Sequence, residues 1–66
     1  MKNRIAELRK EKSLTQMDLA RQTAVSRQTI ISLENGKYNP SITLAYKIAK
    51  IFGLAIEEVF IFDEEE

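Results

Sequence analysis

TQMDLARQTAVSRQTIISLENG, residues 15–36, is the stretch of sequence that decides the fold. It contains two typical helix starts, because Thr15 and Ser26 are both good N-cap residues. Asp18 follows Thr15 by three residues, the spacing of a capping box. The stretch therefore predicts two short helices joined by a turn at residues 23–25.

Helical patterns flank this stretch on both sides. Upstream, Ile5 and Leu8 form an apolar stripe among charged residues, which predicts a first helix of about ten residues. Downstream, Asn35-Gly36 ends the second helix of the pair, because glycine suits the left-handed backbone that closes helices. Ser41 then caps a helix with a broad apolar face, and Gly53 ends that helix.

We therefore expect an all-α fold, with five helices in a single domain of residues 1–66. The paired helices occupy about residues 15–34, and a last short helix covers residues 56–60. Whether the chain continues at Ile61-Phe62 as a short extended segment is left open. An acidic tail follows at residues 63–66.

The composition excludes several kinds of site. The chain has no cysteine and no histidine, so it lacks disulfides, cysteine-based zinc sites and the commonest general base. We expect no metal and no cofactor. We also expect no enzymatic activity, because many of the acids cluster near the chain end, where burial does not shift their pKa values. No signal peptide core and no apolar run of ~20 residues is present, so we expect a cytoplasmic protein without a membrane partner.

The net charge of zero is an average over two unlike parts. Residues 1–50 hold all ten lysines and arginines with four acids, a net charge of +6. Residues 51–66 hold six acids and no base, a net charge of −6. This asymmetry favours a polyanion as partner of the first part, although a solvated charged surface with a frayed acidic end would look the same.

The second helix of the pair opens with side chains that can read DNA. In a helix-turn-helix, this helix enters the major groove with its N-terminal end first, so its opening residues meet base edges. Arg27 can pair bidentately with guanine, and Gln28 can do the same with adenine. An isolated Arg-Gln pair would more often be ordinary solvated surface. The surrounding two-helix pattern reverses that preference and predicts double-stranded DNA as the partner.

The same stretch resembles the Cro/C1-type helix-turn-helix of phage repressors and their bacterial and archaeal relatives, and the resemblance spans roughly residues 3–60. Its most specific parts are Thr15-Gln16, Leu19-Ala20, Val25-Ser26-Arg27, Ile30 and Glu34-Asn35-Gly36. The layout is similar to that of short stand-alone dimeric repressors such as the cytolysin repressor. The resemblance implies a lambda-repressor-like fold and a transcriptional repressor that binds a pseudo-palindromic operator as a homodimer.

The resemblance also implies roles for individual residues. The positions that would read bases are Arg27, Gln28, Thr29 and Ser32. The positions that would contact the DNA backbone are Gln16, Asn35, Lys37, Tyr38 and Asn39. Some of these residues have a plainer explanation, since Thr29 can help to cap its helix and Asn39 precedes a proline in a turn.

Arg9 and Glu34 match an ion pair that, in this family, ties the first helix to the end of the recognition helix. We expect this pair to be structural and not to contact DNA. Ala24 departs from the family, which commonly has glycine there, and alanine adopts left-handed backbone at a cost of about 1 kcal/mol. The turn is therefore expected to be either altered or strained. Ile31 also departs, and we expect an exposed apolar residue, the alternative being contact with thymine methyl groups.

The end of the chain is rich in apolar side chains that suggest a dimer interface. The six residues in question are Leu54, Ile56, Val59, Phe60, Ile61 and Phe62. Part of this set must pack on the preceding helix, and the remainder exceeds what a small monomer normally exposes. We expect a homodimer, the alternative being that all six complete the monomer core.

Two functions of different classes remain after this reading. The first is a homodimeric DNA-binding repressor with no small-molecule effector. The second is an interaction module similar to the antitoxin of a toxin–antitoxin pair. An added toxin-binding segment would favour the second, and almost nothing lies beyond the core domain in this sequence.

Overall fold

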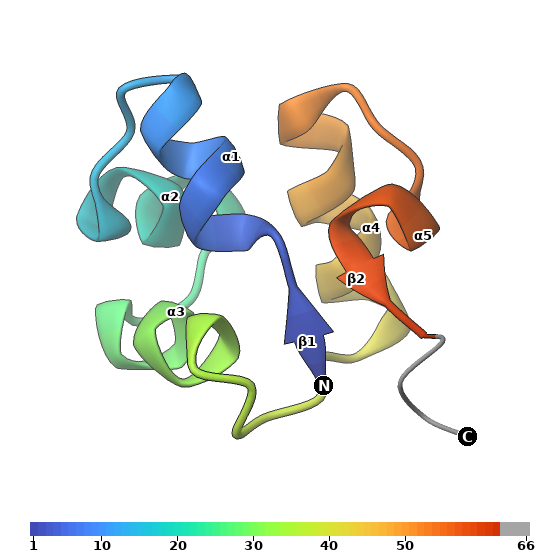
Figure 1. The fold of residues 1–66 in the computed structure, drawn as a ribbon. Coiled ribbons are helices and arrows are strands. Elements are labelled where there is room, and N and C mark those ends of the chain that lie inside the picture. Colours follow the sequence, from blue (N-terminus) through green and yellow to red (C-terminus); the bar gives the residue numbers. More distant parts are fainter. Residues whose placement is uncertain (63–66) are drawn as a thin grey trace.

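Five helices and one two-stranded sheet make up residues 1–62, the part of the chain that the computed structural model describes. The acidic tail predicted at residues 63–66 lies outside the described residues. The elements are β1 (Lys2–Asn3), α1 (Ile5–Glu11), α2 (Gln16–Thr23), α3 (Arg27–Glu34), α4 (Ile42–Phe52), α5 (Ile56–Val59) and β2 (Phe60–Ile61) (Figure 1). The expected all-α class with five helices is confirmed, with one very small sheet added.

Side-chain caps explain where three of these helices begin. Thr15 and Asp18 form the predicted capping box: the Thr15 hydroxyl accepts the Asp18 N–H at 3.0 Å, and the Asp18 carboxylate accepts the Thr15 N–H at 2.9 Å. Hydrogen bonds from the backbone and side chain of Thr15 hold the pKa of Asp18 below its usual range. Ser26 and Ser41 cap α3 and α4, each accepting the backbone N–H three residues ahead at 3.1 Å.

Two outcomes were open for the turn between α2 and α3, an altered backbone or a strained alanine, and the structure shows the strained alanine. Ala24 adopts left-handed backbone, with φ 59° and ψ 40°. This is the conformation that glycine adopts without cost and that an L-residue with a side chain disfavours. Ser13, in the turn after α1, also has a positive φ of 57°, which the sequence pattern did not indicate.

Ala24→Gly is expected to raise the free energy of unfolding by about 0.5–1 kcal/mol, because relief of the left-handed strain outweighs the added entropy of the unfolded chain. Chemical denaturation of the parent and the variant measures the change. Ala6→Gly, the same substitution inside α1, is the control and should be destabilising by about 1 kcal/mol. Equal effects of the two substitutions would contradict the assignment of strain to Ala24.

Two helix ends differ from the sequence-based expectation. The first helix has seven residues and not about ten, because the chain turns at Lys12-Ser13. The last helix ends at Val59, since Phe60 leaves the helix to pair with Asn3. The extended segment left open in the sequence thus exists as β2, one residue earlier than expected, and its partner is β1.

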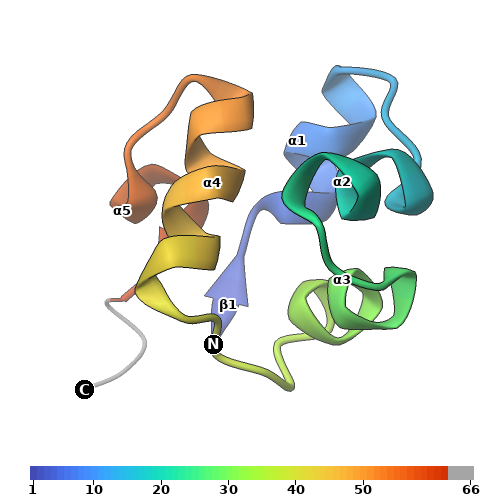
Figure 2. The ribbon, with the colours of Figure 1, turned by 180° about the vertical axis from the view of Figure 1, so that it is seen from behind.

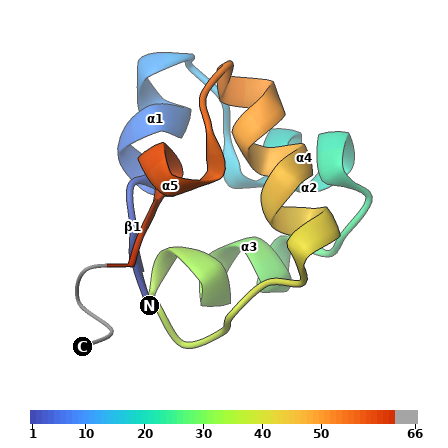
Figure 3. The ribbon, with the colours of Figure 1, turned by 90° about the vertical axis from the view of Figure 1, so that its right-hand side faces the viewer.

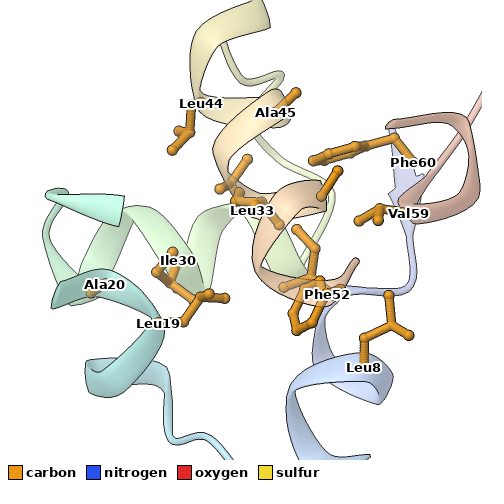
Figure 4. Packing of buried hydrophobic residues seen from close by; sticks show 13 residues of the cluster. Leu8, Leu19, Ala20, Ile30, Leu33, Leu44, Ala45, Phe52, Val59 and Phe60 are labelled. Atoms are coloured by element: carbon orange, nitrogen blue, oxygen red, sulfur yellow. The ribbon is translucent and has the colours of Figure 1, made fainter. Parts of the chain in front are cut away.

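The five helices pack around a common centre (Figures 2 and 3), and their apolar faces meet there in one core (Figure 4). Figure 4 shows Leu19 of α2 beside Ile30 of α3, and both are fully buried. Val59 and Phe60 are also buried, at 0% and 1% exposure. Their side chains offer no surface to a second subunit, so both leave the predicted dimer interface and join the monomer core. Within residues 1–62, no helix is long and apolar enough to span a membrane.

Candidate nucleic-acid interface

The start of α3 presents the two predicted base readers to solvent. Ser26 caps the helix, so that Arg27 and Gln28 fall in its first turn, and both are exposed. Ile30 and Leu33 are fully buried on the other side of the helix and fix its rotation. α3 lies along one edge of the molecule in all three ribbon views (Figures 1, 2 and 3). This edge can therefore approach a groove with the helix start leading.

A shallow hollow continues the same face of α3. It has a volume of about 190 Å³, and we call it the recognition hollow; its lining residues are Ser26, Gln28, Thr29, Ser32 and Tyr38. Within it, the hydroxyls of Ser26 and Thr29 are hydrogen-bonded at 3.0 Å. The fold thus brings three predicted base readers together with Tyr38, which comes from the following loop. Ile31, predicted to be an exposed apolar residue, is half-buried.

The predicted backbone contacts after α3 form an exposed loop. Asn35, Lys37, Tyr38 and Asn39 are all exposed, and we call residues 35–39 the phosphate loop. Two hydrogen bonds start this loop: the Lys37 N–H donates to the Ser32 carbonyl at 3.1 Å, and the Gly36 N–H donates to the Leu33 carbonyl at 3.0 Å. Gly36 has a φ of 72°, as its predicted role at the helix end requires.

Arg9 and Glu34 form the predicted ion pair. The Arg9 Nε lies 2.7 Å from Glu34 Oε2, and the two side chains are 12% and 8% exposed. Arg9 also donates through Nη1 to the Leu14 carbonyl at 2.9 Å. The pair joins α1 to the end of α3 and is too enclosed to serve as a DNA contact.

Gln16 also belongs to this network and supports the end of α3, as the family resemblance implies for a residue that both contacts phosphate and buttresses the recognition helix. Its Nε2 donates to Glu34 Oε1 at 3.1 Å. A glutamine amide has two N–H donors, so this bond holds the side chain in place and leaves one donor for another acceptor. The predicted phosphate contact of Gln16 is compatible with that geometry.

A second hollow is lined by residues from the turn after α1 and from the start of α3. It has a volume of about 600 Å³, and we call it the basic hollow; its lining residues are Arg9, Lys10, Ser13, Leu14, Thr15, Gln16, Met17 and Arg27. Lys10 is exposed there, and we add it to the candidate phosphate contacts. The sequence pattern gave no signal for Lys10, because only the folded turn brings the end of α1 to the same hollow as Arg27.

Together, these elements form one polar face. The recognition hollow lies over the exposed start of α3, the phosphate loop follows the end of α3, and the basic hollow lies beside the start of α2. Side chains that can read base edges are thus flanked by side chains that can hold phosphates. This division is typical of protein–DNA contacts, in which phosphate contacts position the protein and base contacts specify the sequence.

Comparison with known proteins agrees with this geometry. A helix-turn-helix family model matches residues 5–59. An HTH-type transcriptional regulator of Archaeoglobus fulgidus is 56% identical over 66 residues, which are the whole of this chain and 93% of that protein. A regulator of Methanocaldococcus jannaschii is 54% identical over the full length of both chains. The immunity repressor of Bacillus phage phi105 is 34% identical over 85% of this chain and 39% of that protein.

A solved structure with the same arrangement is also similar. The restriction-modification controller protein C.AhdI from Aeromonas hydrophila superposes with a TM-score of 0.77 at 32% identity, and the match covers 86% of each chain. The matched family is one of transcription regulators and not of enzymes. The Cro/C1-type resemblance is thus confirmed over nearly the whole chain. This chain belongs to the helix-turn-helix family of DNA-binding transcriptional regulators.

Proposed function

We propose that this regulator is a repressor that binds a pseudo-palindromic operator in double-stranded DNA as a homodimer. The observation that carries the proposal is the exposed pair Arg27 and Gln28 at the capped start of α3. These are side chains that distinguish guanine and adenine in the major groove. The similarity to a phage immunity repressor supports repression as the outcome of binding. The whole chain acts as a single domain in the cytoplasm.

The residues divide into two groups by their task. Arg27, Gln28, Thr29 and Ser32 face base edges, with the Thr29 hydroxyl oriented by its hydrogen bond to Ser26. Contacts to phosphate come from the phosphate loop, from Gln16 and from Lys10. The second group positions the protein on any sequence, and the first group selects one.

A homodimer is proposed because one module of this size reads too few base pairs for high specificity. Exposed or half-buried apolar side chains remain on the C-terminal side of the fold, namely Leu54, Ile56, Ile61 and Phe62. Phe62 is 46% exposed. Two copies that bury these side chains around a two-fold axis would present two α3 helices to successive major grooves, about 34 Å apart.

Selection of binding sites from random DNA tests the proposal. The expected result is a gapped palindrome whose half-sites are centred about one helical turn apart. A single ungapped half-site would contradict the dimer and leave specific binding intact. The absence of any enriched motif at moderate salt would contradict sequence-specific binding itself.

Arg27→Ala and Lys37→Ala are expected to weaken binding in different ways. Arg27→Ala should cost about 1–3 kcal/mol on the selected site and relax the preference at one base position. Lys37→Ala should weaken binding to all sequences alike and lower the slope of log K against log salt by about one. Fluorescence anisotropy with specific and mixed-sequence duplexes at several salt concentrations separates the two. The same pattern of loss in both variants would refute the assignment of roles.

A further inference from the structure

The short strand β1 lies between the recognition helix α3 and the C-terminal strand β2 (Figure 1). On one side, its backbone pairs with β2, with Lys2 opposite Ile61 and Asn3 opposite Phe60. On the other side, the Asn3 side chain reaches α3, where its Nδ2 donates to the Leu33 carbonyl at 2.8 Å. One residue of β1 thus bridges two elements that do not follow each other in the chain.

The same side chain also helps to begin α1. The Asn3 Oδ1 accepts the backbone N–H of Ile5 at 3.0 Å. Both functional atoms of the amide are therefore occupied, the oxygen by the start of α1 and the nitrogen by the end of α3. Asn3 is only partly exposed, so both bonds are sheltered from competing water.

The Leu33 carbonyl is the point at which the phosphate loop begins. It accepts the Gly36 N–H as well as the Asn3 amide. Gly36 itself lies against Met1, the residue before β1: a Cβ atom there would stand 3.0 Å from the Met1 carbonyl oxygen, and the Met1 amino group donates to the Gly36 carbonyl at 3.0 Å. The first turn of the phosphate loop is therefore in contact with the N-terminal segment that includes β1.

We propose that Asn3 is a positioning residue for DNA binding. It holds the end of α3, and with it the phosphate loop, in the position in which the loop meets the DNA backbone. The proposal rests on the phosphate contacts assigned to this loop under the proposed function. Lys37, Tyr38 and Asn39 are exposed. The loop that carries them is held through its backbone, at the Leu33 carbonyl by Asn3 and at the Gly36 carbonyl by the Met1 amino group. A shift of the end of α3 would carry these side chains away from a phosphate, and the bond from Asn3 to the Leu33 carbonyl opposes that shift.

Asn3→Asp tests this role with the smallest change in shape. Aspartate keeps the oxygen that accepts the Ile5 N–H, but a carboxylate oxygen replaces the amide donor and faces the Leu33 carbonyl. We expect the variant to fold and its affinity for a mixed-sequence DNA duplex to fall about tenfold, since a sheltered carbonyl loses its donor and a phosphate contact is lost. The slope of log K against log salt should fall by about one.

The salt slope distinguishes positioning from a general loss of stability. Ile48→Val removes one methylene from the core in α4 and is destabilising without removing either Asn3 hydrogen bond, so it should leave the slope unchanged. Amide chemical shifts of residues 36–39 should move in Asn3→Asp and stay in place in Ile48→Val. Asn3→Asp also adds a negative charge, which weakens DNA binding by itself, so the neutral Asn3→Ser is measured beside it. Serine can still accept the Ile5 N–H and is too short to reach Leu33. A loss of affinity and slope in Asn3→Asp alone would overturn the positioning role.

A measurement on Lys37→Ala distinguishes a failure of this inference from a failure of the proposed function. If Lys37→Ala lowers the salt slope and Asn3→Asp leaves both slope and affinity at the parental values, Asn3 has no positioning role and the loop still contacts DNA. If Lys37→Ala leaves the slope unchanged, Lys37 makes no phosphate contact, and both its assigned role and this inference are overturned.

Discussion

Glu34→Ala is expected to lower the free energy of unfolding by about 3–5 kcal/mol, because it strands the Arg9 guanidinium in an enclosed site. Arg9 is 12% exposed and lies 2.7 Å from the Glu34 carboxylate. After the substitution, Arg9 would keep the Leu14 carbonyl as an acceptor and lose its counter-charge. Gln16 would lose the acceptor of its Nε2 in the same step.

Urea denaturation followed by circular dichroism measures this loss. The double variant Arg9→Met with Glu34→Leu is the matched control, since it removes both charges and leaves apolar groups of similar volume. It should recover most of the stability that Glu34→Ala loses. A loss below about 1 kcal/mol in Glu34→Ala would show that water screens the pair as it screens a surface ion pair.

The parts of the fold that the sequence predicts correctly are those with local causes. The Thr15–Asp18 capping box, the Ser26 cap and the left-handed Gly36 and Gly53 each depend on residues within a few positions of one another. Short-range hydrogen bonds and backbone sterics decide them before any tertiary contact exists. The cap also places Arg27 and Gln28 in the first turn of α3, whereas their exposure depends on the burial of Ile30 and Leu33 on the other side of the helix.

The parts that the sequence leaves unpredicted depend on distant segments. The pairing of Asn3 with Phe60 involves two strands of two residues each, too short for any alternation of apolar and polar residues to appear. Lys10 joins Arg27 only through the basic hollow, and Tyr38 joins Ser32 only as part of the lining of the recognition hollow. Such contacts come from the packing of whole elements, which no local pattern records.

Phe60→Ala is expected to cost about 3–5 kcal/mol of stability, the range for a large aromatic residue removed from a core. Phe60 is 1% exposed and packs in the cluster where α5 and β2 meet the helices. A chain of 66 residues has only one small core, so this loss is comparable to the whole stability of many domains of this size. We expect the variant to be largely unfolded at 37 °C by circular dichroism.

Phe62→Ala is the matched control, because it deletes the same ring two residues further along the chain. Phe62 is 46% exposed, so the monomer should lose no more than about 0.5 kcal/mol. If the exposed apolar residues form the dimer interface, Phe62→Ala should nevertheless weaken self-association in sedimentation equilibrium. The unfolding midpoint of the parent should then rise with protein concentration, and that of Phe62→Ala should rise less, since dimerisation stabilises only folded subunits. A midpoint independent of concentration in both proteins would place Phe62 outside any interface and contradict the proposed dimer.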